Sequence, residues 1–366
     1  MTELLSIDGP GRVSMVHQDA PVAPEGGFLV ETVFSGVSAG TELTYVKGTN
    51  PYLRASWDPV LGVFGTGRPG VAYPVRGIGY MQVGMVVHSR TGAVAEGRLV
   101  AMAYGHRTAY AADPLRDRFV ELPPDLDPLL GIYVAHMGPI CANGLLHAAH
   151  DLHGAGVQQL RDGVRGRRVV VVGAGVVGLL TAAFAAGAGH GTEVTVVDET
   201  PARLCVAAEL GVETVLAEDA LGLKHRWRHG PGEHGADVVF QCRGQARALA
   251  LALRLLRPQG TVIDLAFYTE GAGEVRLGEE FHHNGLSLRC AQIGRVPRGL
   301  AHAWNRDRLS RETVELLHGI GPWLRRHVIT DLVRFGKAPQ LLRDLAARRR
   351  HAVQAVLCRD VQDERG

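Results

Sequence analysis

Residues 168–198 constrain this chain more than any other segment, because a buried strand, a glycine-rich turn, a helix and a second strand follow one another in order. The first strand is the valine run 169–172, whose unbroken apolar character is typical of a strand covered on both faces. The turn reads Gly-Ala-Gly-Val-Val-Gly over residues 173–178, and helix formers follow it. A second apolar run, 194–197, ends on Asp198. This order predicts a βαβ unit that binds a nicotinamide or flavin dinucleotide.

Each glycine of the turn has a distinct predicted role. Gly173 permits the tight turn, Gly175 lets the backbone approach a pyrophosphate, and Gly178 lets the helix pack closely on the strand. The helix N-terminus, with Val176 and Val177, offers unpaired N–H groups and a partial positive charge to the phosphates. We therefore expect these five residues to bind the cofactor.

Asp198 bears on the choice of cofactor. Its carboxylate is expected to accept hydrogen bonds from the adenosine ribose hydroxyls and to repel a 2′-phosphate. The next basic residue along the chain is Arg203, whereas a pocket that recognises a 2′-phosphate usually has an arginine beside this position. The sequence thus favours NAD(H) over NADP(H), and Arg203 keeps NADP(H) open.

The wider composition is that of an ordinary globular protein. The chain has 366 residues, enough for two domains, with 46% hydrophobic residues and a net charge of +2, which gives no basic surplus for nucleic acid. The sequence has no signal-peptide pattern and no run long enough to span a membrane, so we expect a cytoplasmic protein. Its five cysteines form no C-x-x-C pair, which argues against a disulfide framework or a compact zinc site.

The strand pattern divides the chain into two regions. Four further apolar runs end near residues 216, 242, 266 and 291, which completes a doubly wound domain over 145–294. We expect Cys242, at the end of the fourth strand, to contact the cofactor. The first 144 residues instead show short strands between Gly and Pro turns, typical of an antiparallel β domain. The long loop within 48–79 carries Tyr52, Trp57 and Phe64, which can form an apolar or sugar-stacking wall.

Several motifs outside the glycine turn resemble one family. They are SGVSAGTE at 35–42, GYMQVGMV at 79–86, GRLV at 97–100 and CANGL at 141–145. With the glycine turn, they make the chain similar to the medium-chain dehydrogenase/reductase superfamily, of the zinc alcohol dehydrogenase type. The resemblance implies an α/β fold: a GroES-like, β-rich catalytic domain over 1–144 and 295–366, plus the doubly wound Rossmann domain over 145–294. It also implies a homodimer that pairs the strand at 286–291 across a two-fold axis.

The resemblance fails at the metal ligands. Zinc-using members carry a Cys in the first motif, where Ser38 and Ala39 stand here, and a Gly-His-Glu in the second, where this chain has Gly79-Tyr80-Met81. Only Cys141 remains near a ligand position. A catalytic zinc needs three N, S or carboxylate ligands, so we predict no zinc, although the many histidines, His106 among them, leave a rearranged site open.

Four residues are candidates for the chemistry without a metal. The resemblance places Tyr80 where a zinc ligand stood, as a proton donor to the substrate oxygen, and a structural tyrosine under the cofactor is the alternative. Thr41 matches the hydroxyl that relays protons, or fills a turn. Glu42 matches the acid beside it, which orients a base, binds substrate or caps a helix beginning near residue 43. His136 is an acid or base, or a satisfied core histidine.

Together these features predict a metal-independent, NAD(H)-linked oxidoreductase that interconverts an alcohol and a ketone on a small polar molecule. The acidic loop 270–280 either binds a cationic, amino-sugar or aminocyclitol-like substrate or is a solvated surface loop. By analogy, antibiotic biosynthesis is a possible setting. The alternatives are an enoyl or quinone C=C reductase, which usually uses NADPH, and an NAD(H)-binding protein without turnover.

Overall fold

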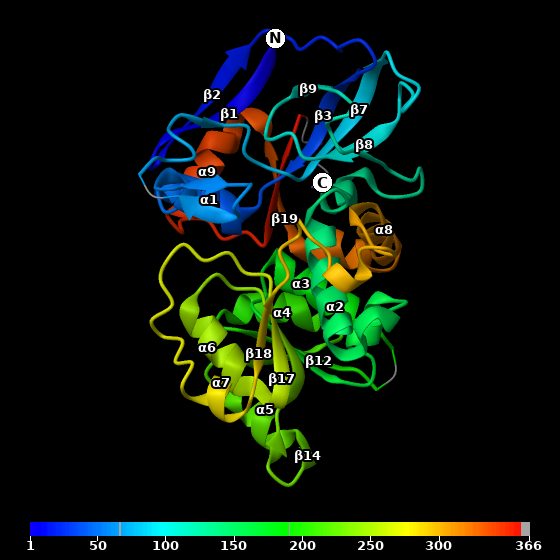
Figure 1. Cartoon of the computed structure of the whole chain (residues 1–366). Helices are drawn as coiled ribbons and strands as arrows, with labels where there is room; N and C mark the ends of the chain where they lie inside the picture. The colour runs from blue at the N-terminus through cyan, green and yellow to red at the C-terminus, as the bar shows by residue number, and fades with distance from the viewer. Residues whose placement is uncertain (66, 190, 360–366) are drawn as a thin grey trace. The chain divides into compact units, whose positions relative to one another are not determined.

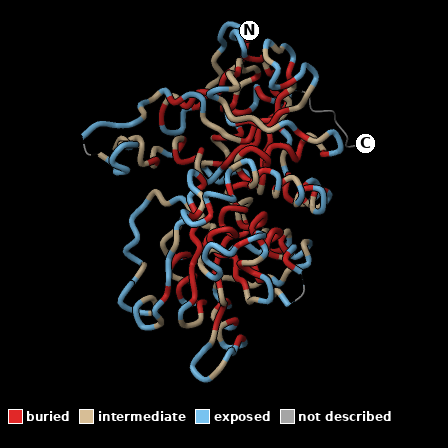
Figure 2. The backbone as a smooth tube through the Cα atoms, turned by 45° about the vertical axis from the view of Figure 1, so that its right-hand side comes forward, coloured by how far each residue is buried: buried red, intermediate tan, exposed pale blue. Residues whose placement is uncertain are grey.

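The chain forms two compact units, described here from a computed structural model covering residues 1–65, 67–189 and 191–359. The first unit is Met1–His136 together with the chain from Ile329 onward, and the second is Met137–Val328. Figure 1 shows the elements of each unit. In Figure 2 the buried backbone is concentrated in the central strands of each unit and exposed backbone in the loops.

The first unit is rich in β-structure. Its larger sheet has the strand order β10-β8-β7-β3-β20-β19, with β9 also paired to β3, and its smaller sheet has the order β2-β1-β6. The strands are β1 Thr2–Gly9, β2 Arg12–Gln18, β3 Phe28–Gly36, β6 Val75–Arg76, β7 Gln82–Ser89, β8 Leu99–Met102, β9 Ala109–Ala112, β10 Val120–Glu121, β19 Ile329–Arg334 and β20 Gln354–Cys358. The helices α1 (Ala39–Lys47) and α9 (Ala338–Ala346) pack on each other beside the smaller sheet.

The second unit is a parallel sheet of six strands in the order β13-β12-β11-β16-β17-β18. The strands are β11 Arg168–Val172, β12 Glu193–Asp198, β13 Glu213–Leu216, β16 Ala236–Gln241, β17 Leu256–Asp264 and β18 Ser287–Cys290. Alternate valines of β11 point to opposite faces: Val170 and Val172 join a core with α5 (Leu221–Arg226) and α6 (Ala246–Leu255), and Val171 lies towards α3 (Val176–Ala186). The remaining elements are α4 Pro201–Ala208, β14 Arg228–Gly230, β15 Glu233–His234 and α7 Glu280–His283. The predicted fold class, a β-rich domain plus a doubly wound domain, is confirmed.

The boundaries of the second unit differ from those predicted. Residues 137–144 and 295–328, assigned from the sequence to the catalytic domain, belong to the Rossmann unit. They form most of α2 (Met137–His153) and α8 (Arg306–Trp323), which pack against each other and against α3. Gly138 makes this approach possible, because a side chain there would meet that of Thr313 at 2.1 Å.

None of the helices within the described residues is long and apolar enough to cross a membrane.

Candidate active site

A cluster of hydroxyl groups lies at the N-terminus of α1. Ser38 is the residue before the helix, is almost completely buried, and its Oγ forms a short hydrogen bond with the hydroxyl of Tyr80. Thr41 Oγ1 lies 3.4 Å from the same phenol oxygen. Two predicted residues, Thr41 and Tyr80, are therefore brought together, and Ser38 joins them as a partner of Tyr80 that the sequence did not single out.

Glu42 lies in the wall of this cluster. Its carboxylate is buried and accepts a hydrogen bond of 2.9 Å from the Ser38 N–H, as expected of a residue that caps the helix start. The other carboxylate oxygen lies 2.8 Å from His106 Nε2, with both side chains almost without solvent exposure. Glu42 thus orients both an imidazole and the backbone that presents Ser38.

The buried pair extends into a longer polar chain. His106 Nδ1 lies 2.7 Å from Ser35 Oγ, which accepts from Gln82 Nε2 at 3.0 Å. The side-chain carbonyl oxygen of Gln82, Oε1, in turn accepts a hydrogen bond from the backbone N–H of Tyr104 at 3.1 Å. Burying a polar group costs free energy unless the group is hydrogen-bonded, and here each of these side chains has a partner. This hydrogen-bonded network therefore fixes the position of the N-terminus of α1.

The fourth predicted residue, His136, packs on Tyr80. The two ring centroids are 4.5 Å apart and the planes are tilted by 48°. Both residues are partly exposed, so the imidazole and the phenol lie side by side at the solvent-exposed side of the hydroxyl cluster. The structure therefore places all four candidates, Tyr80, Thr41, Glu42 and His136, in or beside one cluster.

The donors present here do not fit a zinc ion. Ser38 and Tyr80 offer neutral hydroxyls, and both ring nitrogens of His106 are already engaged by Glu42 and Ser35. In the second unit, the Sγ of the buried Cys141 donates to the carbonyl of Val177. Among the described residues, no group of three or more His, Cys, Asp or Glu side chains is placed to bind a metal.

The glycine turn of the second unit has the geometry of a phosphate cradle. Gly173 has φ +106°, which favours glycine, and a Cβ on Gly178 would lie 1.7 Å from the Gly173 carbonyl oxygen. A Cβ on Gly175 would meet nothing within 4 Å, so open space lies where a ligand would approach the backbone. Val176 and Val177 begin α3 with partly exposed side chains at this opening. These residues fit a bound dinucleotide.

Asp198 is more enclosed than expected. Its carboxylate has no solvent exposure, and its two oxygens accept the N–H groups of Ala174 and Thr200, each at 2.8 Å. An arginine distant in sequence also lies near it, because Arg243, from the loop after β16, comes within 3.9 Å of Asp198 Oδ1. Arg203 lies in the first turn of α4, partly buried.

Cys242 ends the strand next to the glycine turn. Its backbone N–H donates to the carbonyl of Val172 at 2.9 Å, which ties the end of β16 to the end of β11. Burial raises the pKa of its thiol well above the ordinary value. The Cys242 backbone thus lies beside the turn that the glycines form, and its contact with the cofactor stays a prediction.

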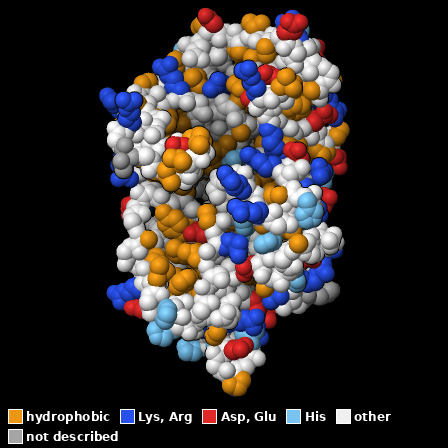
Figure 3. All heavy atoms as spheres, in the orientation of Figure 1, with side chains coloured by type: hydrophobic (Ala, Val, Ile, Leu, Met, Phe, Trp, Pro, Cys, Tyr) orange, Lys and Arg blue, Asp and Glu red, His pale blue; other side chains and the backbone are white. Residues whose placement is uncertain are grey.

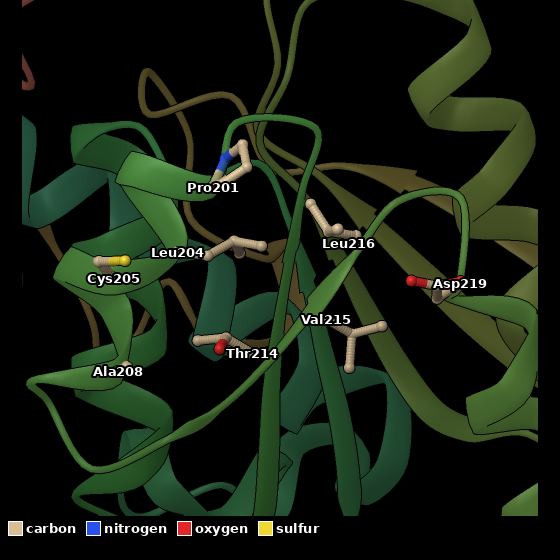
Figure 4. A pocket seen from close by; sticks show the side chains of 8 residues that line it. All are labelled: Pro201, Leu204, Cys205, Ala208, Thr214, Val215, Leu216 and Asp219. Carbon is tan, nitrogen blue, oxygen red and sulfur yellow. The ribbon is translucent and has the colours of Figure 1, made fainter.

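A groove of about 440 Å³ runs between α4 and β13. Figure 4 shows its lining, which comes from α4, from β13 and from the residues that follow β13. The lining residues are Pro201, Leu204, Cys205, Ala208, Thr214, Val215, Leu216 and Asp219. Leu216 is paired in register with Asp198, so the groove lies beside the strand that carries the acid.

The predicted aromatic wall forms a cluster in the first unit. Trp57 and Tyr52 each meet the Phe64 ring edge-on, with centroids 5.3 Å apart, across the hairpin of β4 (Ser56–Asp58) and β5 (Val63–Gly65). Trp57 and Phe64 are 44% and 45% exposed, and hydrophobic side chains interrupt the polar surface on the face seen in Figure 3. The hairpin thus offers an exposed aromatic surface of the kind that stacks on sugars.

Comparison with known proteins finds similarity to dehydrogenases over part of the chain. Residues 176–304 match a family model described as zinc-binding dehydrogenase. The chain is 30% identical over 172 residues to D-guloside 3-dehydrogenase of Escherichia coli K12, covering 47% of this chain and 49% of that protein. It is 29% identical over 106 residues to sorbitol dehydrogenase of Halalkalibacterium halodurans, covering 29% and 31%. These alignments span about half or less of the length of the curated relatives.

Solved structures show the same fold over the whole chain. A dehydrogenase from Sinorhizobium meliloti 1021, bound to NADP, superimposes with a TM-score of 0.71 at 20% identity, covering 98% of this chain and 99% of that one. The family model covers residues from the start of α3 onward, and the solved structure shares the fold. The chain is therefore similar to zinc-type dehydrogenases over part of its length.

Proposed function

We propose that this chain is a zinc-independent oxidoreductase that moves a hydride between a nicotinamide cofactor and a ketone or secondary alcohol of a small polyhydroxylated molecule. The observation that carries the proposal is the hydroxyl cluster: Ser38 and Tyr80 are hydrogen-bonded to each other, and the sequence resemblance assigns these two positions to metal ligands. The relatives named as guloside and sorbitol dehydrogenases support a polyol or sugar as substrate.

The dinucleotide would be held by the second unit, through the N–H groups after Gly173, the open backbone at Gly175 and the start of α3. The chemistry that a bound nicotinamide supplies is hydride exchange with the substrate carbon. NAD(H) is the cofactor we propose, because Asp198 and Glu199 place two carboxylates at the end of β12.

In this proposal Tyr80 exchanges a proton with the substrate oxygen, a transfer that a bound metal ion would otherwise ease by stabilising negative charge on that oxygen. Ser38 and Thr41 hold the phenol by hydrogen bonds and pass its proton onward. Glu42 and His106 are positioning residues, because Glu42 accepts the Ser38 N–H and His106 contacts the other oxygen of the Glu42 carboxylate. His136 covers one face of the Tyr80 ring and limits the access of water.

The acidic loop does not add support for a cationic substrate. Of its acids, Glu279 pairs with Arg276 at 3.2 Å and Glu280 with Arg254 at 3.2 Å, while Glu270 and Glu274 are exposed. Paired and solvated carboxylates are typical of an ordinary surface loop. We therefore propose a neutral polyhydroxylated substrate in place of an amino sugar.

A homodimer is also proposed, through β18. This strand pairs with β17 on one side, and within the described residues no strand covers its other edge, where Leu288 is 41% exposed. Light scattering of Leu288→Arg should give a monomer. Leu332→Arg, on the exposed edge strand β19, should stay dimeric.

The deciding experiment for the activity combines metal analysis with a substrate panel. We expect the purified protein to contain well under one zinc per chain. It should oxidise or reduce members of a polyol and ketose panel with NAD(H), before and after treatment with a strong chelator. One zinc per chain, with activity lost on chelation and restored by zinc, contradicts the metal-free proposal. Binding of NADH without turnover of any polyol, ketone or enone contradicts the enzyme.

A further inference from the structure

Four charged side chains meet where the carboxyl ends of β12 and β16 approach the glycine turn. Arg243 Nη2 donates to Glu199 Oε2 at 2.8 Å, and Arg247, from the first turn of α6, donates to the same oxygen at 3.1 Å. Arg243 Nη1 also lies 3.9 Å from Asp198 Oδ1. One carboxylate oxygen is thus held between two guanidinium groups.

The two acids, Asp198 and Glu199, differ in their burial and in their hydrogen-bond partners. Asp198 has no solvent exposure, and each of its oxygens already accepts a backbone N–H, so it serves to join the glycine turn to the end of β12. Glu199 is 40% exposed, and its ion-pair partners among the described residues are the two arginines. Glu199 is therefore the anion of this cluster that a ligand can displace.

The arginine pair has the chemistry of an oxyanion site. Two guanidinium groups aimed at one acceptor are suited to a carboxylate or a phosphate, and guanidinium binds both through directed N–H groups. In a βαβ unit, the residues beside the acid that ends the second strand contact the 2′ position of the adenosine ribose. An internal carboxylate in this site competes with any phosphate brought there by a ligand.

We propose that Glu199, and not Asp198, decides which nicotinamide cofactor this chain accepts. Glu199 occupies the anion site formed by Arg243 and Arg247, so that NAD(H) binds with the carboxylate in place and a 2′-phosphate enters only by displacing it. The site is thus a latent 2′-phosphate site closed by a side chain of its own. This inference rests on the proposed binding of a dinucleotide.

Two nucleotide fragments test it without catalysis. Calorimetric titration compares 5′-ADP with 2′,5′-ADP, which differ only in the 2′-phosphate. Wild-type protein should bind 5′-ADP more tightly. Glu199→Gln should shift the ratio of the two affinities at least fivefold towards 2′,5′-ADP, mainly by tightening the binding of 2′,5′-ADP. Glu218→Gln, which removes the same charge from an exposed residue after β13, should leave the ratio within twofold.

A second variant tests whether Arg247 is responsible for the tighter binding of 2′,5′-ADP. Adding Arg247→Gln to Glu199→Gln should abolish the shift, since Arg247 is 58% exposed and can be replaced without loss of the fold. A ratio that moves less than fivefold in Glu199→Gln, or equally in Glu218→Gln, overturns the inference and leaves dinucleotide binding intact. Failure of wild-type protein to bind 5′-ADP, 2′,5′-ADP and NADH overturns the proposed function, and this inference with it.

Discussion

At the scale of single residues, the proposed chemistry depends most on the phenol of Tyr80. Tyr80→Phe keeps the ring that packs on His136 and removes only the hydroxyl bonded to Ser38 and Thr41. Because general acid catalysis contributes about 10²-fold or more, we expect kcat to fall by about that factor, with the NADH dissociation constant unchanged. Steady-state kinetics and NADH fluorescence titration measure the two quantities.

Tyr73→Phe is the matched control for this substitution. The Tyr73 hydroxyl donates to the carbonyl of Tyr45 at 2.6 Å in the same unit, so its loss costs about 1 kcal/mol of stability and no rate. A Tyr80→Phe enzyme within threefold of wild-type kcat would reject the proton role, and so would an equal loss in Tyr73→Phe. Either result would favour the structural tyrosine that the sequence left as the alternative.

Local motifs in the sequence were enough to propose the catalytic candidates but not to identify the residues that contact them. Thr41 and Glu42 follow one another in a motif, and Tyr80 replaces a residue with a known place in the family, so local pattern was enough to find them. His106 lies 64 residues from Glu42, and Arg243 lies 44 residues from Glu199, and no spacing rule links such pairs. The available signal was indirect: Ser35 and Gln82 are polar residues in apolar strands, which indicates a buried network.

At the scale of elements, two glycines of the turn allow the effects of a substitution on stability and on cofactor binding to be measured separately. Alanine at Gly178 would lie 1.7 Å from a backbone oxygen, so Gly178→Ala should destabilise the protein by about 1–3 kcal/mol and weaken NADH binding. Alanine at Gly175 meets open space, so Gly175→Ala should cost at most about 1 kcal/mol, mainly through the helix cap. It should nevertheless weaken NADH binding at least tenfold.

Urea unfolding and NADH titration of the two variants provide the measurement. Full NADH affinity in Gly175→Ala would mean that no ligand approaches the backbone there, which would contradict the assigned cradle. Wild-type stability in Gly178→Ala would contradict the close contact of helix and strand.

Elements with strong apolar runs were predictable, and those without were not. The central strands β11, β12 and β16 match the predicted runs because burial on both faces requires unbroken apolar, β-branched residues. The hairpin of β14 and β15 was missed, since its residues are polar and not periodic. α2 was also missed, because Gly138, Pro139 and Gly144 resemble helix breakers although the helix is buried. That omission explains the misplaced domain boundary.

At the scale of the whole molecule, the order of elements determined the fold, and composition excluded other classes. An alternation of strands and helices after a β-rich region is compatible with few architectures, so two domains could be predicted without any contact information. Packing decided which domain each peripheral helix joined, and α8 joined the second unit because its Thr313 meets Gly138.

Global stability at mildly acid pH should depend on His147 in α2. Burial, with Arg289 and His150 nearby, lowers the pKa of His147 from 6.5 to about 4. Between these values the unfolded chain binds a proton that the folded chain does not, so stability falls as the pH drops from 6.5 towards 4. The pKa values of Asp8, Glu213 and Asp344 are lowered from ordinary values of 3.8 or 4.5, so these carboxylates titrate mainly below this window.

His147→Gln should therefore flatten the dependence of the unfolding free energy on pH between 6.5 and 4. We expect the wild-type protein to lose on the order of 2 kcal/mol more than the variant across this window, measured by urea unfolding at steps of half a pH unit. His225→Gln, at an exposed position of α5, is the control and should keep the wild-type slope. Parallel curves for wild type and His147→Gln would mean that His147 binds a proton equally well in the folded and the unfolded protein. That result would contradict the lowered pKa of His147, which follows from its burial beside Arg289 and His150.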